Sequence, residues 1–130
     1  MANPFYISLL VGVGGAAGSL SRYGLSLGSQ RLGAEWPLGT LAANILGCLF
    51  IGIIAGASGR GEAISPEMRL ALATGFCGGF TTMSSMIYES AELLRAGEYL
   101  HATVYAVGSF GLSLMAFFAG LLVVRLLFRV

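Results

Sequence analysis

The stretch that decides the fold is GFCGGFTTMSSM, residues 75–86. It lies inside an apolar segment of membrane-spanning length, from about Leu70 to Leu94. Three glycines loosen a helix here, and two threonines and two serines occur just after them. A helix broken inside hydrocarbon is tolerated only where it is buried in protein or lines an aqueous path. We therefore expect a span broken near Gly75-Thr82, with an ion or substrate pathway beside the break.

The composition outside this stretch is that of a membrane protein. Of 130 residues, 56% are hydrophobic and only 10% are charged, whereas soluble domains carry roughly 25% charged residues. A net charge of +1 gives no reason to expect nucleic-acid binding. Cys48 and Cys77 both lie in apolar segments, so we interpret them as small buried hydrophobic residues rather than disulfide or metal ligands.

The charged residues divide the chain into four apolar segments, each long enough to cross a hydrocarbon core of ~30 Å as a helix. These segments are Pro4 to Ser29, Trp36 to Ser58, Arg69 to Leu94 and His101 to Leu127. Ser65, Pro66 and Glu67 have the pattern of a helix start. No basic residue precedes the first apolar run, so a cleaved signal peptide is not expected. We predict one all-α transmembrane domain over residues 1–130.

The arginines give a weak signal for orientation in the membrane. Four spans place both termini and the connection near residue 60 on one side. That side then holds four arginines, Arg60, Arg69, Arg125 and Arg129. The opposite side holds three, Arg22, Arg31 and Arg95. Such a small bias permits insertion in both orientations, and two oppositely inserted copies could pair about an axis in the membrane plane. A fixed orientation explains the count equally well.

Glycines are frequent, and several have the small-xxx-small spacing that lets helix backbones approach closely. The pairs are Gly14 with Gly18, Gly24 with Gly28, Gly52 with Gly56, and Gly75 with Gly79. We expect most of them to serve packing. Gly75, Gly78 and Gly79 are expected instead to interrupt the third span.

Uncharged polar side chains recur at helical spacing inside the spans. These are Thr40 with Asn44, the pair Met83 and Met86, and the row Tyr105, Ser109 and Ser113. Hydroxyls, an amide and polarisable groups can bind a passing anion without trapping it. The alternative is that the hydroxyls bond to helix carbonyls and only join helices. Their alignment beside a broken helix favours a pathway. No set of residues suited to catalysis is evident.

Three motifs together resemble a known family. GGAAGSLSRY at 14–23, PLGTLAANILGCLFIG at 37–52 and GFCGGFTTMSSM at 75–86 are similar to the signatures of the Fluc fluoride channels, also called CrcB proteins. The resemblance covers nearly the whole chain. It implies passive fluoride export across the bacterial inner membrane by an antiparallel, dual-topology homodimer. Such a dimer has two pores and a structural sodium ion at its centre.

The resemblance also implies roles for individual residues. Asn44 and Thr40 would face the pore, and Arg22 would lie near its vestibule. The polar track of the last helix would consist of Tyr105, Ser109 and Ser113, and the sodium ion would bind the backbone carbonyls of Gly78 and Thr81. Met83 and Met86 depart from the family, which usually has phenylalanines whose positive ring edges meet fluoride. Methionine offers a polarised S-methyl group and a flexible stem instead.

Two other functions remain open from the sequence. A small proton-coupled multidrug-type transporter can also have four helices, but it needs an acidic residue inside the first span, which this chain lacks. A non-transporting assembly subunit would leave the polar track without a purpose. Glu89 follows Met86 by one turn and is interpreted as a paired structural acid or a vestibule residue.

Overall fold

The computed structural model describes residues 3–59 and 64–128, and every element in those ranges is helical. The elements are α1 (Pro4–Arg31), α2 (Leu38–Ser58), α3 (Pro66–Arg69), the π-helix η1 (Leu70–Cys77), α4 (Gly78–Phe80), α5 (Met83–Arg95) and α6 (Tyr99–Leu127). Four stretches are long and apolar enough to cross a membrane: α1, α2, the run from α3 to α5, and α6. The predicted all-α, multi-pass membrane class is confirmed.

Local signals explain where these helices begin and turn. Asn3 caps α1 by accepting a hydrogen bond from the Phe5 N–H at 3.0 Å, and Pro4 occupies the first helical turn. Ser65 caps α3 in the same way, accepting from the Met68 N–H at 3.2 Å, which confirms the predicted helix start there. The connection after α1 turns at Gly33, whose φ of 70° favours glycine.

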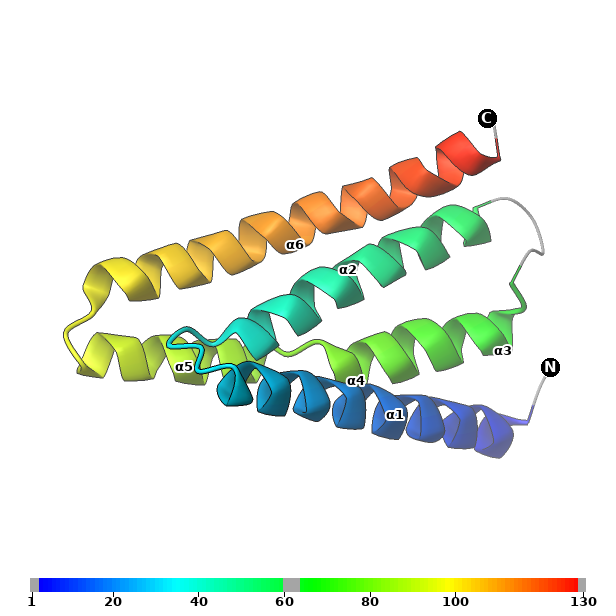
Figure 1. Cartoon of the computed structure of the whole chain (residues 1–130). Coiled ribbons are helices and arrows are strands. Elements are labelled where there is room, and N and C mark those ends of the chain that lie inside the picture. Colours follow the sequence, from blue (N-terminus) through cyan, green and yellow to red (C-terminus); the bar gives the residue numbers. More distant parts are fainter. Residues whose placement is uncertain (1–2, 60–63, 129–130) are drawn as a thin grey trace.

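The four spans run back and forth along one axis (Figure 1). The start of α1, the end of α2, the start of α3 and the end of α6 lie at one end of the molecule, and the α1–α2 and α5–α6 connections lie toward the other. α2 packs along α6, and α1 packs along η1 and α4. The third span is therefore held against the first on one side of the break.

Glycines allow α1 to contact η1 and α4 backbone to backbone. A Cβ atom added to Gly18 would lie 2.1 Å from the Phe76 carbonyl oxygen, and one on Gly79 would lie 2.3 Å from the Gly15 oxygen. Gly52 of α2 lies equally close to α6, since a Cβ atom there would lie 2.1 Å from the Phe117 oxygen. The packing prediction is confirmed for Gly18 and Gly52, whereas a Cβ atom on Gly24 or Gly28 would meet nothing within 4 Å in the described chain.

The interruption of the third span does not occur at the glycines. Gly75, Gly78 and Gly79 all lie in helical segments, and Gly78 has helical dihedrals of −62° and −38°. The helix instead ends at Phe80, and Thr81 and Thr82 are extended, with ψ of 157° and 123°. The expectation that the glycines interrupt the helix was wrong, and the missing side chains of Gly75 and Gly79 instead serve contact with α1.

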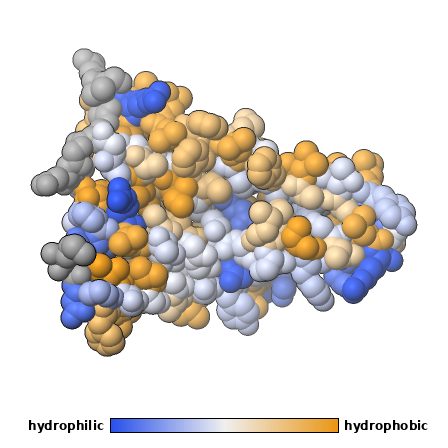
Figure 2. All heavy atoms as spheres, turned by 180° about the vertical axis from the view of Figure 1, so that it is seen from behind, coloured by the Kyte–Doolittle hydropathy of each residue, from blue (hydrophilic) through white to orange (hydrophobic). Residues whose placement is uncertain are grey.

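Large apolar side chains are exposed on every long helix of the described chain. Examples along α1 and α6 include Val13 and Leu20, which are 62% and 70% exposed, and Val107 and Phe118, which are 67% and 58% exposed. Figure 2 shows apolar residues over much of the visible face. Such a surface is stable only against lipid or another apolar protein surface, which fits a multi-pass membrane protein.

Candidate functional site

The break in the third span is fixed by the side chain of Asn44 on α2. Its Nδ2 donates to the Thr82 carbonyl at 3.0 Å, and its Oδ1 accepts from the Thr82 N–H at 2.7 Å. Asn44 is only 9% exposed. The amide oxygen thus replaces the Gly78 carbonyl as the acceptor for the Thr82 N–H, and the amide N–H adds a second donor to the Thr82 carbonyl, which also begins α5.

The two threonines of the break also stabilise the helices on either side. Thr82 caps α5, because its Oγ1 accepts from the Ser85 N–H at 3.1 Å. Thr81 Oγ1 donates to the Cys77 carbonyl at 2.9 Å, at the end of η1. The extended pair is therefore capped by its own side chains as well as by Asn44.

A cavity of about 350 Å³ lies beside the break, between α2, α5 and α6. It is lined by Asn44, Cys48, Thr81, Thr82, Met83, Met86, Ser109, Phe110, Ser113, Leu114 and Phe117. Five residues that the sequence predicted for the pathway are thus brought together. The two methionines differ in burial, because Met86 is 9% exposed whereas Met83 is 65% exposed.

Two hydroxyls in this cavity are free to bind a ligand. The Oγ atoms of Ser109 and Ser113 are buried and have no hydrogen-bond partner among the described residues. Other hydroxyls in these helices bond to their own backbone, as Ser90 does to the Met86 carbonyl at 2.7 Å. The alternative that the track merely bonds to helix carbonyls therefore fails for these two serines.

Glu89 of α5 links the two remaining members of the polar set. Thr40 Oγ1 donates to Glu89 Oε1 at 2.7 Å, and Tyr105 OH donates to Glu89 Oε2 at 2.5 Å. Thr40 and Tyr105 are 4% and 2% exposed, so these hydrogen bonds are shielded. The sequence identified Thr40 and Tyr105 separately but not the carboxylate that joins them. Glu89 is indeed a paired acid.

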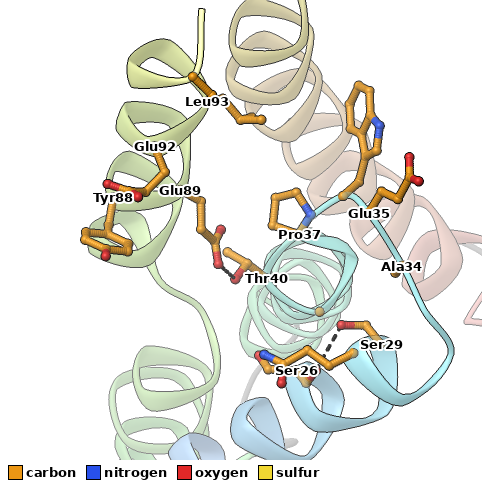
Figure 3. Close-up of a pocket in the computed structure, with 14 residues that line it drawn as sticks. Ser26, Ser29, Ala34, Glu35, Pro37, Thr40, Tyr88, Glu89, Glu92 and Leu93 are labelled. Atoms are coloured by element: carbon orange, nitrogen blue, oxygen red, sulfur yellow. Dashed lines mark hydrogen bonds between the residues drawn. The ribbon is translucent and has the colours of Figure 1, made fainter. Parts of the chain in front are cut away.

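Glu89 also faces a second cavity of about 370 Å³ at the α1–α2 connection. Figure 3 shows Glu89 reaching from α5 toward Thr40 on α2, with Glu35 and Glu92 also around this cavity. Sequence reasoning missed the serines Ser26 and Ser29 that line it, because their spacing resembles ordinary helix polarity. The two cavities thus lie on either side of the linked Thr40–Glu89–Tyr105 set.

Arg22 contacts the broken span rather than either cavity. Its Nε donates to the Gly79 carbonyl at 3.2 Å, and Ser19 Oγ approaches the same oxygen at 3.4 Å. Arg22 is not among the residues that line either cavity. A positive charge at this point stabilises the carbonyl end of a short helix. Its predicted vestibule role stays a prediction.

The two cysteines have different surroundings, although the sequence suggested the same role for both. Both thiols are free. Cys77 is 1% exposed and lies inside the η1 contact, as expected of a small hydrophobic residue. Cys48 is only half-buried and lines the cavity beside the break. The interpretation as a small buried hydrophobic residue is therefore confirmed for Cys77, whereas Cys48 is only partly buried.

The backbone beside the break is also the predicted cation site. Within the described ranges, no cluster of three or more histidine, cysteine or acidic side chains could hold a metal ion. Carbonyl oxygens are the donors that remain. The Gly78 carbonyl has lost the Thr82 N–H to Asn44, and Gly78 is exposed at the surface of the chain. Oxygen donors of this kind suit a hard cation.

Comparison with known proteins identifies the family of this chain. The family model described as "CrcB-like protein, Camphor Resistance (CrcB)" matches residues 9–121. A protein of Chlorobium phaeobacteroides named "Fluoride-specific ion channel FluC" is 45% identical over 97% of this chain and 98% of its own length.

Two further relatives carry the same name. One from Chlorobaculum tepidum is 46% identical over 91% of this chain and 94% of its own length. One from Rhizobium leguminosarum bv. trifolii is 47% identical over 92% of this chain and 97% of its own length. The similarity thus extends over all four spans.

Proposed function

Since the chain belongs to the CrcB family, we propose that it is a fluoride channel that lets fluoride leave a bacterial cell passively. The observation that carries the proposal is the pair of buried, unpartnered hydroxyls on Ser109 and Ser113. They face a cavity that also contains the Asn44 amide. Within the part of the chain that is described, no arginine lines this cavity, so an anion would meet donors without being trapped.

The path would run from the cavity at Glu89 to the cavity beside the break. Tyr105, Ser109 and Ser113 are each one turn apart on α6, so their hydroxyls would succeed one another along it. An asparagine amide has two N–H donors, and Thr82 occupies one of them. The second donor and the serine hydroxyls would replace water around fluoride.

Glu89 adds a condition to this path. A carboxylate and fluoride are both acceptors, so they would compete for the Thr40 and Tyr105 hydroxyls. With Glu89 holding both donors, this segment would be less attractive to an anion than the serine segment. Passage would therefore require those hydroxyls to turn from Glu89 to the ion, which makes Glu89 a regulator of entry.

The functional unit would be an antiparallel homodimer with sodium at its centre. The exposed Gly78 and the adjacent break supply oxygen donors from one chain, which are too few to surround a cation. A second copy related by a two-fold axis would supply the same donors again. We infer that the Gly78 and Thr81 carbonyls of both copies would hold the ion, whose role would be structural.

Fluoride efflux from liposomes tests the function. Protein reconstituted into vesicles loaded with potassium fluoride should release fluoride without any proton gradient, once valinomycin lets potassium leave with it. An ion-selective electrode measures the release. Ser109→Ala with Ser113→Ala should lower the rate about tenfold or more, because a hydrogen bond to a charged group contributes roughly 1.5–3 kcal/mol. Ser21→Ala is the matched control, since that exposed hydroxyl only bonds to the Ala17 carbonyl.

The same assay separates the alternatives. A proton-coupled transporter would move protons together with fluoride and would change the pH inside the vesicles, and an assembly subunit would release no fluoride at all. Efflux in the absence of a gradient that the serine pair does not affect would remove the serines from the pathway. No efflux from dimeric, folded protein would overturn the proposed function.

A further inference from the structure

Sulfur atoms gather at the cavity beside the break. The chain has two cysteines and five methionines, and three of these seven residues line this cavity: Cys48, Met83 and Met86. Cys48 lies one helical turn beyond Asn44 on α2, and the methionines are three residues apart at the start of α5. Two helices therefore present one thiol and two thioethers to the same space.

Thiolate and thioether are the donors that select soft monovalent metals such as Cu⁺ and Ag⁺. The Cys48 thiol is free for such a bond because it forms no disulfide. The methionine stems are unbranched and can adjust their sulfur positions. A second, independent feature of the cavity also suggests a ligand, since Ser109 is 2% exposed and its hydroxyl has no partner among the described residues.

We propose that this cavity binds a single soft metal ion, Ag⁺ or Cu⁺, through Cys48 Sγ, Met83 Sδ and Met86 Sδ. On binding, the Cys48 S–H bond breaks, its proton passes to water and a sulfur–metal bond forms. The metal keeps its oxidation state, so no oxidant or reductant takes part. One thiolate and one monovalent cation give a neutral group, which suits an apolar cavity.

A bound ion would also close the proposed fluoride path. It would occupy the space between Asn44 and the two unpartnered serines, and the methionine S-methyl groups would turn their sulfur atoms inward toward the metal. This closure depends on the proposed channel function. The binding of the metal does not, so the two can be tested separately.

Calorimetric titration with silver nitrate tests binding on the purified protein. The buffer contains nitrate and no chloride, because silver chloride precipitates. Wild type should bind a single Ag⁺ per chain, and X-ray absorption should show sulfur neighbours. Removing a direct ligand by Cys48→Ser or Met86→Leu should weaken binding about tenfold or more. Cys77→Ser and Met115→Leu are the matched controls, since neither residue lines the cavity.

Three results would each overturn the site. The first is that wild type binds no Ag⁺. The second is that Cys77→Ser loses binding while Cys48→Ser keeps it, and the third is an X-ray absorption spectrum that shows only oxygen or nitrogen neighbours around the metal. Size-exclusion chromatography shows whether Cys48→Ser folds. If it does not fold, Met86→Leu still tests the site.

Fluoride efflux in nitrate buffer then tests closure. Micromolar Ag⁺ should stop wild-type efflux, and excess thiourea should restore it. Each ligand variant is compared with its own untreated rate and should resist silver. Binding at the sulfur cluster with unchanged efflux would overturn closure alone. Wild type without any efflux would contradict the channel function, while the titration would still decide the metal site.

Discussion

At the scale of single residues, Asn44 connects the fold to the proposed pore. Its side chain bonds to both backbone groups of Thr82, and it also lines the cavity that contains the serine hydroxyls. The sequence predicted only the second role. The first role depends on which backbone segment α2 meets, and helical spacing alone does not specify that partner.

Replacing Asn44 should therefore affect stability as well as fluoride flux. Asn44→Leu keeps the volume but leaves the Thr82 N–H unsatisfied, at a cost of about 1–3 kcal/mol. We expect a lower thermal unfolding temperature in detergent and a slower efflux. Ile45→Leu at the neighbouring position is the control. An Asn44→Leu protein as stable as wild type would show that the break does not depend on this amide.

Met83 and Met86 stand where related channels usually have phenylalanines, so they allow a test of whether methionine can take over the role of those rings in the proposed pore. Methyl hydrogens beside sulfur carry some positive charge, and isoleucine lacks both that charge and the flexible stem. We expect Met83→Ile and Met86→Ile to lower fluoride flux, and phenylalanine at either position to preserve it. Met115→Ile, on an exposed face of α6, is the control. Isoleucine variants with wild-type flux would mean that the methionines only pack.

Much of the candidate site could be predicted from helical spacing. Asn44, Ser109 and Ser113 do meet in one cavity with the methionines, because residues four apart share a helix face. The pairing of Glu89 with Thr40 and Tyr105 could not be predicted in this way. It joins three different helices, and only their relative rotation brings the carboxylate between the two hydroxyls.

At the scale of elements, the ends of the four spans predicted from hydropathy lie within a few residues of the helix ends in the structure. The position of the break was less predictable. Glycines are poor helix formers, so propensity pointed to Gly75, Gly78 and Gly79. Contact with α1 requires Gly75 and Gly79 inside a helix, and Asn44 instead stabilises the extended threonines. Tertiary contacts therefore overrode local propensity by a few residues.

The contact between α1 and the third span should be sensitive to a single methyl group. A Cβ atom on Gly18 would lie 2.1 Å from the Phe76 oxygen, so Gly18→Ala must push two backbones apart. Overpacking of this kind costs typically 1–3 kcal/mol. We expect a lower unfolding temperature in detergent. Gly12→Ala, on the same helix with nothing within 4 Å, is the control and should be no less stable than wild type.

An unaffected Gly18→Ala protein would mean that α1 can move away from the third span without loss. A matching loss in Gly12→Ala would place the effect on α1 itself rather than on its contact. Either result would contradict the close backbone approach as the source of stability.

At the scale of the whole molecule, the surface of one chain bears on the proposed dimer. Its long helices expose large apolar side chains, and Gly78, whose carbonyl is released from the Thr82 N–H, lies at its surface. If two copies share a sodium ion there, sodium should stabilise the dimer by mass action. We expect a higher unfolding temperature in sodium than in N-methylglucamine at equal ionic strength. Identical unfolding in the two solutions would contradict the sodium site.

The orientation of the two copies gives the last prediction. Adding positive charge to one end of the chain should fix its orientation, because arginine-rich loops stay on the cytoplasmic side. Leu32→Arg with Glu98→Arg biases one end, and Glu62→Arg with Glu67→Arg biases the other. In an antiparallel dimer, either variant alone should lack partners of opposite orientation and should release little fluoride.

Expressing both variants together should restore efflux, because each supplies the orientation that the other lacks. Accessibility of a terminal tag from outside the cell checks the orientation of each variant, and wild type should show both orientations. A parallel dimer would behave in the opposite way, since a single fixed variant would pair with itself and stay active. Full activity of either fixed variant alone would therefore contradict the antiparallel arrangement, whatever the position of the sodium ion.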